Sequence, residues 1–526
     1  VAAIRSSAKT QWGKKIIADL EQKVKERRKH SLEVPKEEGG HFHDYFCPVH
    51  NLQFTFRWDK PLAQYCSACD KEWIGNNRYD WAWIYEVHML NRDYMYQCMY
   101  LYLATGKRQY ADYIRTMLLD YAGKYAGWFE HNSGRKATDQ HSGKAFAQSL
   151  DEANWATKVA MAYMAIKPVL SKEEVKAIEE GYLQPAATLL LHRPAGANWQ
   201  MWHNSGLAAL GIALENDSIV DVAINKDKYG YHYLIGKHKN SDGWINEGSP
   251  HYHYYPLEAL LFTANAVKCR GIKLFDKDLH DMFVEPVKGT YPDLSFPAHS
   301  DGWYGANLLS QSALYEVGNA RYNDPFLKRV LELTYAQKKR LDPEALLSNQ
   351  LIKASEESLL QKSYSFDTSG FCLLRSDTRT VVLKFGGEGI GHGHPDKLSI
   401  TIHDGKNELV SDFGTSGYGV PDYLKWYKRT LSHNTVTVDA KDQKRSVGKL
   451  LKFNPRSDGG YAEAETTTAY PGVRMKRSLD LKGTHLQDVY TCTSDSSHLY
   501  EYVILFNEKP LMDGQPTATT LTGSEV

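Results

Sequence analysis

The chain has 526 residues, of which 42% are hydrophobic and 24% charged, and its 63 Lys and Arg balance its 63 Asp and Glu. This composition is ordinary for a globular protein, and the length predicts two or three domains. Zero net charge excludes a general electrostatic attraction to nucleic acid or to an anionic membrane, so neither is expected as a partner. No apolar run reaches the ~20 residues that would span a bilayer.

Helical periodicity dominates the chain up to about residue 345. Ser171 followed by Glu173 and Glu174 has the form of a helix start. We expect helices at residues 12–28, 81–105, 109–126, 145–166, 171–191, 199–214, 218–237, 254–267, 277–287 and 324–339. Many helices joined by short turns favour stacked helical hairpins over alternating strands and helices.

Near residue 350 the period changes to short β-branched and alternating runs separated by turn residues. Strands are expected at residues 363–375, 380–385, 398–402, 408–411, 435–439, 460–466, 477–481, 487–493 and 500–506. This pattern predicts an antiparallel β-sandwich over residues 346–526. The Thr-rich end lacks a clear last strand, so we expect a C-terminal truncation.

Three of the seven cysteines gather in one short stretch with a histidine, in the order Cys47, His50, Cys66 and Cys69. A C-x2-H pair followed by a C-x2-C pair is zinc-ribbon spacing, which predicts a structural zinc ion in a small insertion at residues 40–75. A disulfide between two of the three cysteines is the alternative. Four closed ligands would leave no open position for catalysis.

A second group of polar residues lies in Gly391-His392-Gly393-His394-Pro395-Asp396, near Ser411-Asp412 and His433-Asn434-Thr435. Alternate residues of an extended strand point to the same side, so the two imidazoles of the hexapeptide should face one way. With Asp412 and His433 from neighbouring strands, they could hold Zn²⁺ and still leave one histidine for chemistry. The alternative is a set of surface polar residues around glycine turns.

Two further polar and aromatic segments stand out in the helical half. Residues 197–206 begin a helix, and the amide of Asn198 near its start can cap that helix or face a cavity. Residues 241–255 form a polar, aromatic loop leading into a helix, and binding residues concentrate in loops held by a rigid scaffold. The alternatives are a plain N-cap for Asn198 and a packed aromatic for Tyr252.

Taken together, these segments resemble the heparinase II/III-type polysaccharide lyases, a superfamily that includes exo-type alginate lyases. The resemblance implies an incomplete (α/α) toroid over residues 1–345 followed by an antiparallel β-sandwich. It implies that Asn198 neutralises the substrate carboxylate, Tyr252 serves as proton donor or base, and His392 acts across the cleft. It places a structural zinc on His394, Asp412 and His433. The residues expected to bind substrate are His203, Trp199, Glu247, Tyr254 and Arg429.

The chain departs from the family pattern at two places. Some members carry a histidine directly after the asparagine, where this chain has Trp199, so His203 is a candidate substitute four residues further along the helix. Tyr254 and Tyr255 lie close enough to Tyr252 that the tyrosine assignment stays open by one turn.

The implied reaction is cleavage of a 4-linked uronate by β-elimination. Removal of the C5 proton needs donors aimed at the carboxylate, a role suited to Asn198. With ordinary pKa values of ~10 and ~6.5, tyrosine is the better donor and histidine the better base. Tyr252 could perform both tasks when the C5 hydrogen and the leaving oxygen share a face, whereas His392 would be the base when they do not.

Glycosaminoglycans such as heparan sulfate, heparin, hyaluronan and chondroitin sulfate are the expected substrates, with alginate as the alternative. A glycoside hydrolase on a similar toroid would use two carboxylates, for which Asp242 and Glu247 are the suggestive pair. A non-catalytic glycan-binding protein is a further alternative. Basic residues at 425, 428 and 429 could meet an anionic sugar or be simple surface. We expect a periplasmic or secreted bacterial protein, in which any export signal has already been removed or never existed.

Overall fold

The computed structural model describes residues 1–50, 52–137, 141–357, 359, 362–387, 389 and 391–510. They form two compact units, the first made of residues 1–237, 255–280 and 312–355, and the second of residues 238–254, 281–311 and those from 356 onward. Two segments that precede the predicted boundary at residue 345 therefore group with the C-terminal strands. One of them carries Tyr252, so this residue and His392 belong to the same unit.

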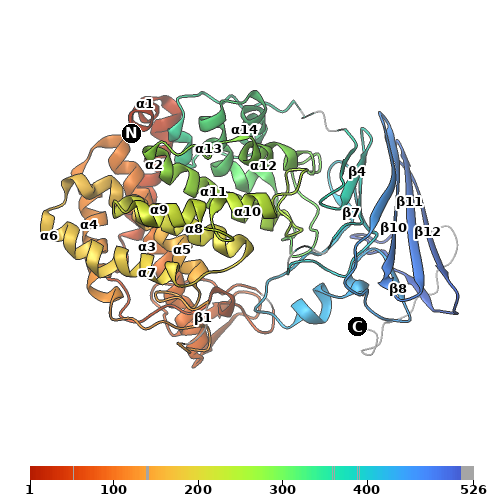
Figure 1. Ribbon diagram of the computed structural model, residues 1–526, viewed down its shortest axis with the longest axis horizontal. Helices are drawn as coiled ribbons and strands as arrows, with labels where there is room; N and C mark the ends of the chain where they lie inside the picture. The colour runs from red at the N-terminus through yellow and green to blue at the C-terminus, as the bar shows by residue number, and fades with distance from the viewer. Residues whose placement is uncertain are drawn as a thin grey trace. The chain divides into compact units, whose positions relative to one another are not determined.

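The first unit is helical, as predicted. Its helices pack in neighbouring pairs, with α3 against α2, α4 and α5, and α5 against α8 (Figure 1). Small residues permit the close approach of α5 and α8, because a Cβ on Gly206 would lie 3.3 Å from the backbone of Ala153. The helices are α1 (Ala2–Lys9), α2 (Gln11–Arg27), α3 (Asn77–Thr105), α4 (Arg108–Tyr125), α5 (Ser149–Ile166), α6 (Lys172–Ile178), α7 (Gln184–Leu191), α8 (Ala197–Ala213), α9 (Asp217–Asn225), α13 (Ser312–Tyr322) and α14 (Pro325–Gln337).

Three more helices, α10 (Tyr231–His238), α11 (His251–Val267) and α12 (Lys277–Val287), run from one unit into the other along the chain. The predicted helix at 218–237 is wrong as a single element, because a turn at residues 226–230 with Lys228 at φ +64° separates α9 from α10. Helix α13 was not predicted. Within the described residues, no helix is long and apolar enough to cross a membrane.

The second unit contains one large antiparallel sheet with strand order β12-β11-β10-β4-β5-β6-β7, and β3 pairs with β4. Strands β8 and β13 form a separate pair. Figure 1 shows β10, β11 and β12 as long strands side by side. The strands are β3 (Tyr364–Phe366), β4 (Phe371–Arg375), β5 (Thr380–Lys384), β6 (Ser399–His403), β7 (Glu408–Val410), β8 (Val436–Val438), β9 (Lys449–Arg456), β10 (Gly459–Tyr470), β11 (Val473–Lys482), β12 (His485–Ser494) and β13 (Tyr500–Tyr502).

Burial explains how this sheet forms its core. All residues of β4 and β5 are buried, whereas β11 alternates buried and more exposed positions, as a strand covered on one face does. The predicted strand at 363–375 is divided by a turn at Gly370, whose φ is +83°. A Cβ added to Gly370 would lie 2.0 Å from the Cα of Gly386. Strand β9 was not predicted. The antiparallel β architecture agrees with the prediction.

A small insertion on the first unit holds the predicted cysteine cluster. It contains the hairpin of β1 (Ala63–Cys66) and β2 (Lys71–Ile74). The buried residues of its core are Tyr45, Cys47, Phe54 and Cys66 together with Ala82 of α3, and the partly buried side chains of Phe56, Cys69, Trp73, Tyr79 and Trp83 pack against them.

Candidate active site

Tyr252 and His392 stack on each other within the second unit. Their ring centroids are 3.5 Å apart and their planes differ by 14°. Tyr252 lies in the first turn of α11, where its backbone N–H donates to Ser249 Oγ at 3.2 Å. The loop before this helix passes very close to the loop that carries His392, because a Cβ on Gly389 would lie 2.4 Å from the carbonyl oxygen of Glu247. A glycine is therefore required at 389, where φ is also positive at +68°.

His392 and His394 lie in the loop between β5 and β6, so the prediction of an extended strand at this hexapeptide is wrong. Gly391 at φ +78° and Pro395 break the strand geometry. The two imidazoles nevertheless meet one common partner. His392 Nδ1 lies 2.9 Å from Asp301 Oδ2, and His394 Nε2 lies 2.9 Å from Asp301 Oδ1.

Asp301 is the centre of this network, and sequence reasoning missed it. Its side chain is fully buried and also accepts hydrogen bonds from the phenols of Tyr418 at 3.1 Å and Tyr423 at 3.0 Å. Although burial opposes it, the hydrogen bonds from His392 and His394, together with the charges of His394 and Lys428, hold the pKa of Asp301 well below its usual range. An ionised carboxylate only accepts hydrogen bonds, so Nδ1 of His392 carries a proton, and in the neutral form of the ring the lone pair lies on Nε2.

Tyr418 was also missed. Its hydroxyl forms a short hydrogen bond with the hydroxyl of Tyr252 and lies 3.1 Å from His392 Nδ1. The one sequence signal was its place in the Gly-rich segment 414–419, directly after Asp412. Three phenols, two imidazoles and one carboxylate thus form a continuous hydrogen-bonded network.

The phenols of this network are neutral at physiological pH. Burial is the main cause that raises the pKa of Tyr252 above its ordinary value; the hydrogen bond from Tyr418 opposes this, and the charges of Asp301 and Glu247 add to it. Burial likewise raises the pKa of Tyr418. A neutral Tyr252 is prepared to give a proton rather than to take one.

Glu247 approaches the opposite edge of the same imidazole, with its Oε2 3.5 Å from His392 Nε2. Its side chain is only 1% exposed. His392 is therefore held between two carboxylates, Asp301 at Nδ1 and Glu247 near Nε2. Lys428 Nζ donates to the carbonyl oxygen of Gly391 at 3.1 Å, which fixes the loop that carries the imidazole.

The side chains predicted to bind zinc have a donor pattern that suits a metal ion. His433 Nδ1 lies 2.9 Å from Asp412 Oδ2, and the centroids of the His394 and His433 rings are 5.2 Å apart. His394 Nδ1 and His433 Nε2 are buried and have no hydrogen-bond partner in the described part of the chain. A carboxylate that orients an imidazole through one nitrogen while the other stays available is the usual surrounding of a metal-bound histidine. Asp396, Asp412 and His433 also place ligand atoms within 4.8 Å of one another.

Asn198, Trp199 and His203 lie on α8 of the helical unit. The N-cap of α8 is Gly196, so Asn198 does not cap this helix. Trp199 makes an edge contact with the ring of His141 at 4.9 Å. Burial lowers the pKa of His203 to about 4, so its ring is neutral and offers no positive charge to a substrate. The roles predicted for these three residues stay predictions.

Other residues predicted to bind substrate are engaged elsewhere in the second unit. Tyr254 is 4% exposed and packs on Phe296 with the ring centroids 5.6 Å apart, so Tyr252, two residues earlier, is the tyrosine that contacts His392. Arg429 Nε lies 2.6 Å from Asp442 Oδ2. Asp242 accepts hydrogen bonds from the backbone N–H and the hydroxyl of Ser369, at 2.8 and 2.7 Å, which orders its loop.

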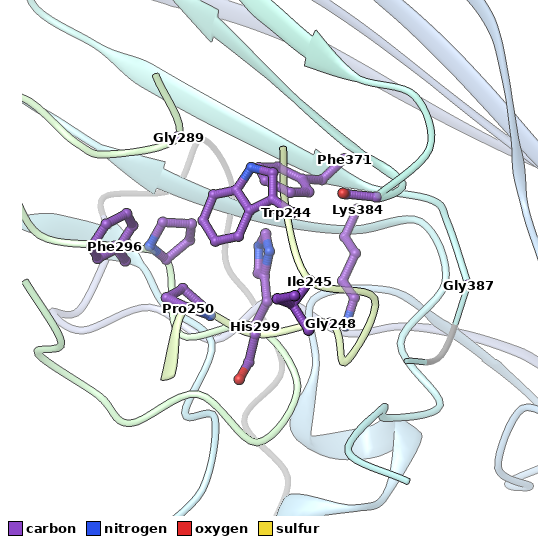
Figure 2. Close-up of a pocket in the computed structure, with 13 residues that line it drawn as sticks. Trp244, Ile245, Gly248, Pro250, Gly289, Phe296, His299, Phe371, Lys384 and Gly387 are labelled. Atoms are coloured by element: carbon purple, nitrogen blue, oxygen red, sulfur yellow. The ribbon is translucent and has the colours of Figure 1, made fainter. Parts of the chain in front are cut away.

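A cavity in the second unit is lined by 13 residues, among them Trp244, His299, Phe371 and Lys384 (Figure 2). Its volume of about 30 Å³ leaves room for about one water molecule. It is therefore a packing cavity and not a sugar-binding cleft.

Family models match two long parts of the chain. The family model described as "Heparinase II/III-like, C-terminal" matches residues 359–510, and the model "Alginate lyase" matches residues 87–284. These matches confirm the resemblance to the heparinase II/III-type polysaccharide lyases that the motifs predicted. An alginate lyase of Stenotrophomonas maltophilia is 29% identical over 476 residues, which cover 80% of this chain and 63% of the relative. An exo-oligoalginate lyase of Saccharophagus degradans is 26% identical, with 81% and 64% covered.

The chain thus spans slightly less than two thirds of the length of these two relatives. A heparin-sulfate lyase of Bacteroides stercoris is 26% identical over 45% of this chain and 35% of the relative. Among solved structures, a heparinase III has a TM-score of 0.61 at 15% identity, with 97% of this chain and 81% of that chain covered. This likeness supports the fold of toroid and β-sandwich that the sequence predicted.

Proposed function

We propose that this protein is a polysaccharide lyase that cleaves 4-linked uronate chains by β-elimination. The observation that carries the proposal is the stacked pair of Tyr252 and His392, with Asp301 on Nδ1 of the imidazole. β-Elimination needs a base for the C5 proton and an acid for the departing C4 oxygen. This network offers a histidine with its lone pair at Nε2 and a neutral phenol, which fit those two tasks.

The protonation states favour one division of labour. Because burial keeps Tyr252 protonated, His392 Nε2 takes the C5 proton and the Tyr252 hydroxyl gives its proton to the leaving oxygen. Asp301 stabilises the imidazolium that forms. Tyr418 shares a hydrogen bond with Tyr252, and its hydroxyl lies 3.1 Å from His392 Nδ1, so it can pass a proton from the imidazolium back to the Tyr252 phenolate and both groups regain their starting states. Asn198 is proposed, from the family resemblance, to neutralise the uronate carboxylate.

We propose alginate-type oligosaccharides as the first substrates to test. Two alginate-acting relatives align with 80% and 81% of this chain, whereas the heparin-sulfate lyase aligns with 45%. The sequence-based preference for glycosaminoglycans stays a prediction beside it. We also propose a structural zinc on His394 and His433, with Asp412 as a ligand or as the carboxylate that orients His433, and a periplasmic or secreted location.

The glycoside hydrolase alternative has less support. Such an enzyme uses two carboxylates that flank an open cleft. The Glu247 and Asp301 side chains are 1% and 0% exposed, and both face His392. Asp242 is hydrogen-bonded to Ser369.

The test is to incubate the protein with a panel of uronic polysaccharides and oligosaccharides and to record ultraviolet absorbance, which rises when an unsaturated uronate forms. We expect Tyr252→Phe to lower kcat by about 10²–10⁴-fold, since it removes the proton donor. Tyr233→Phe is the matched control, because Tyr233 lies on α10 and is 37% exposed. New reducing ends without the absorbance would establish a hydrolase. Binding without any product would establish a glycan-binding protein.

A further inference from the structure

The cysteine cluster of the small insertion has the geometry of a tetrahedral metal site. Cys47 Sγ lies 3.8 Å from His50 Nδ1 and 3.9 Å from Cys69 Sγ, and Cys66 Sγ lies 3.8 Å from His50 Nδ1. All four ligand atoms lie within 4.8 Å of one another. With zinc–sulfur bonds of about 2.3 Å, the sulfurs of a tetrahedral site stand about 3.8 Å apart. The separations therefore match the edges of a tetrahedron around one zinc ion.

The same distances argue against a disulfide. A disulfide requires about 2.05 Å between the sulfurs, and Cys47 and Cys69 are 3.9 Å apart. Every described cysteine is a free thiol. Moreover, bridging two of the three sulfurs would leave the third beside the imidazole with no covalent role. A metal ion uses all four side chains at once.

The surroundings of the cluster also suit thiolates. The backbone N–H groups of Ala68 and Cys69 point to the Cys66 sulfur as hydrogen-bond donors. Cys47 and Cys66 are fully buried, Cys69 is partly buried and His50 is exposed, so the site is anchored in the core and closed from the solvent side by the imidazole. A closed set of three thiolates and one imidazole suits a structural zinc ion rather than a catalytic one.

The insertion also needs a stabilising cross-link such as a metal ion. The described residues of 40–50 and 52–76 form one two-stranded hairpin, a single 3-10 turn at Phe42–Asp44 and irregular chain, and the fully buried side chains of this core are few. A unit this small rarely buries enough apolar surface to hold itself together, so a metal or a disulfide commonly supplies the remainder. We propose that Cys47, His50, Cys66 and Cys69 bind one structural Zn²⁺ that folds this insertion, independently of the lyase activity.

The metal would order more than the hairpin, because the insertion is tied to the loop before α5. Gly39 N–H donates to Ala145 O at 2.9 Å, and Ala147 N–H donates to Gly40 O at 3.2 Å. The side chains of His41 and Gln148 meet at 2.6 Å. Loss of the ion should therefore loosen residues 141–149 as well as the insertion.

Cobalt substitution tests the proposal on the full chain. Only thiolate ligands give a sulfur-to-cobalt charge-transfer absorption, so the candidate site of His394 and His433 cannot contribute to it. We expect the band in the wild type, in Cys269→Ser and in His433→Ala, and its loss in Cys66→Ser. Zinc content should be lower by one ion per chain in Cys66→Ser than in Cys269→Ser. Cys269→Ser is the control because Cys269 is exposed and remote in sequence from the cluster.

A measurement on the wild type covers the case in which Cys66→Ser does not fold. Thiol alkylation followed by peptide mass spectrometry should find Cys47, Cys66 and Cys69 protected until a chelator is added, and Cys269 modified throughout. Alkylation of the three thiols at the same rate with and without chelator would overturn the proposal. A peptide pair linked through two of these cysteines would also overturn it, in favour of the disulfide.

Discussion

Replacing Asp301 by asparagine removes the charge at the centre of the network and keeps the shape of the side chain. Asp301 contacts His392 Nδ1 at 2.9 Å, and its charge is one of the causes that raise the pKa of Tyr252. A hydrogen bond to a charged group contributes about 1.5–3 kcal/mol. At 1.36 kcal/mol for each factor of ten, losing this bond from the imidazolium of the transition state should lower kcat by about 10–150-fold.

The same substitution should change the pH dependence in a defined direction. The negative charge of Asp301 raises the pKa of Tyr252, so its removal lowers that pKa and ionises the phenol at lower pH. Since the neutral phenol is the proton donor, any loss of kcat at alkaline pH should begin at a lower pH than in the wild type, whose Tyr252 stays neutral throughout the assayed range. The assay is the formation of unsaturated product from pH 5 to 10, with Asp242→Asn as the control for a carboxylate away from His392. A kcat within about threefold of the wild type at every pH would refute this reasoning.

Three further substitutions test other parts of the structure. Tyr418→Phe removes a hydrogen bond that lowers the pKa of Tyr252 and so makes this phenol a weaker acid, which should lower kcat about 10-fold or more, measured by the same absorbance. Arg477→Met leaves Asp488 and two buried carbonyl groups without their donor, so the free energy of unfolding in urea should fall by about 3–5 kcal/mol. Burial raises the pKa of Glu344 from 4.5 to about 7, so the folded state binds the extra proton and loses stability as the pH rises from about 4.5 to 7. In Glu344→Gln this loss, up to about 3 kcal/mol, should be absent from the same titration.

The order of the motifs predicted the family resemblance. The change in hydrophobic periodicity predicted the two architectures, because this periodicity is a local property that each segment carries in its own sequence. The helix ends were less predictable. The turn at residues 226–230 carries no proline, and Lys228 adopts positive φ through tertiary context. Strand β9 was not predicted because most of its residues are exposed, so its sequence shows little alternation of apolar and polar residues.

The site was predictable only in part, for a physical reason. Tyr252 and His392 stand in recognisable motifs, and the structure stacks their rings. Asp301 stands in a segment with no periodic signal, and its role arises because the fold brings four donors to one buried carboxylate. Tyr418 is one of 34 tyrosines, and its place in a Gly-rich segment is the one local feature that separates it from those that pack in the core.

The way the chain divides between its two units limits how this site can be separated from the rest of the protein. Residues 238–254 and 281–311 leave the helical half and join the strands, and they bring Tyr252 and Asp301 with them. A fragment cut at residue 345 would retain His392, His394 and Tyr418 but lose the phenol and the carboxylate that meet them. A gene fusion made at that boundary would therefore transfer the strands without Tyr252 and Asp301, so both parts of the chain must be present for the site to be complete.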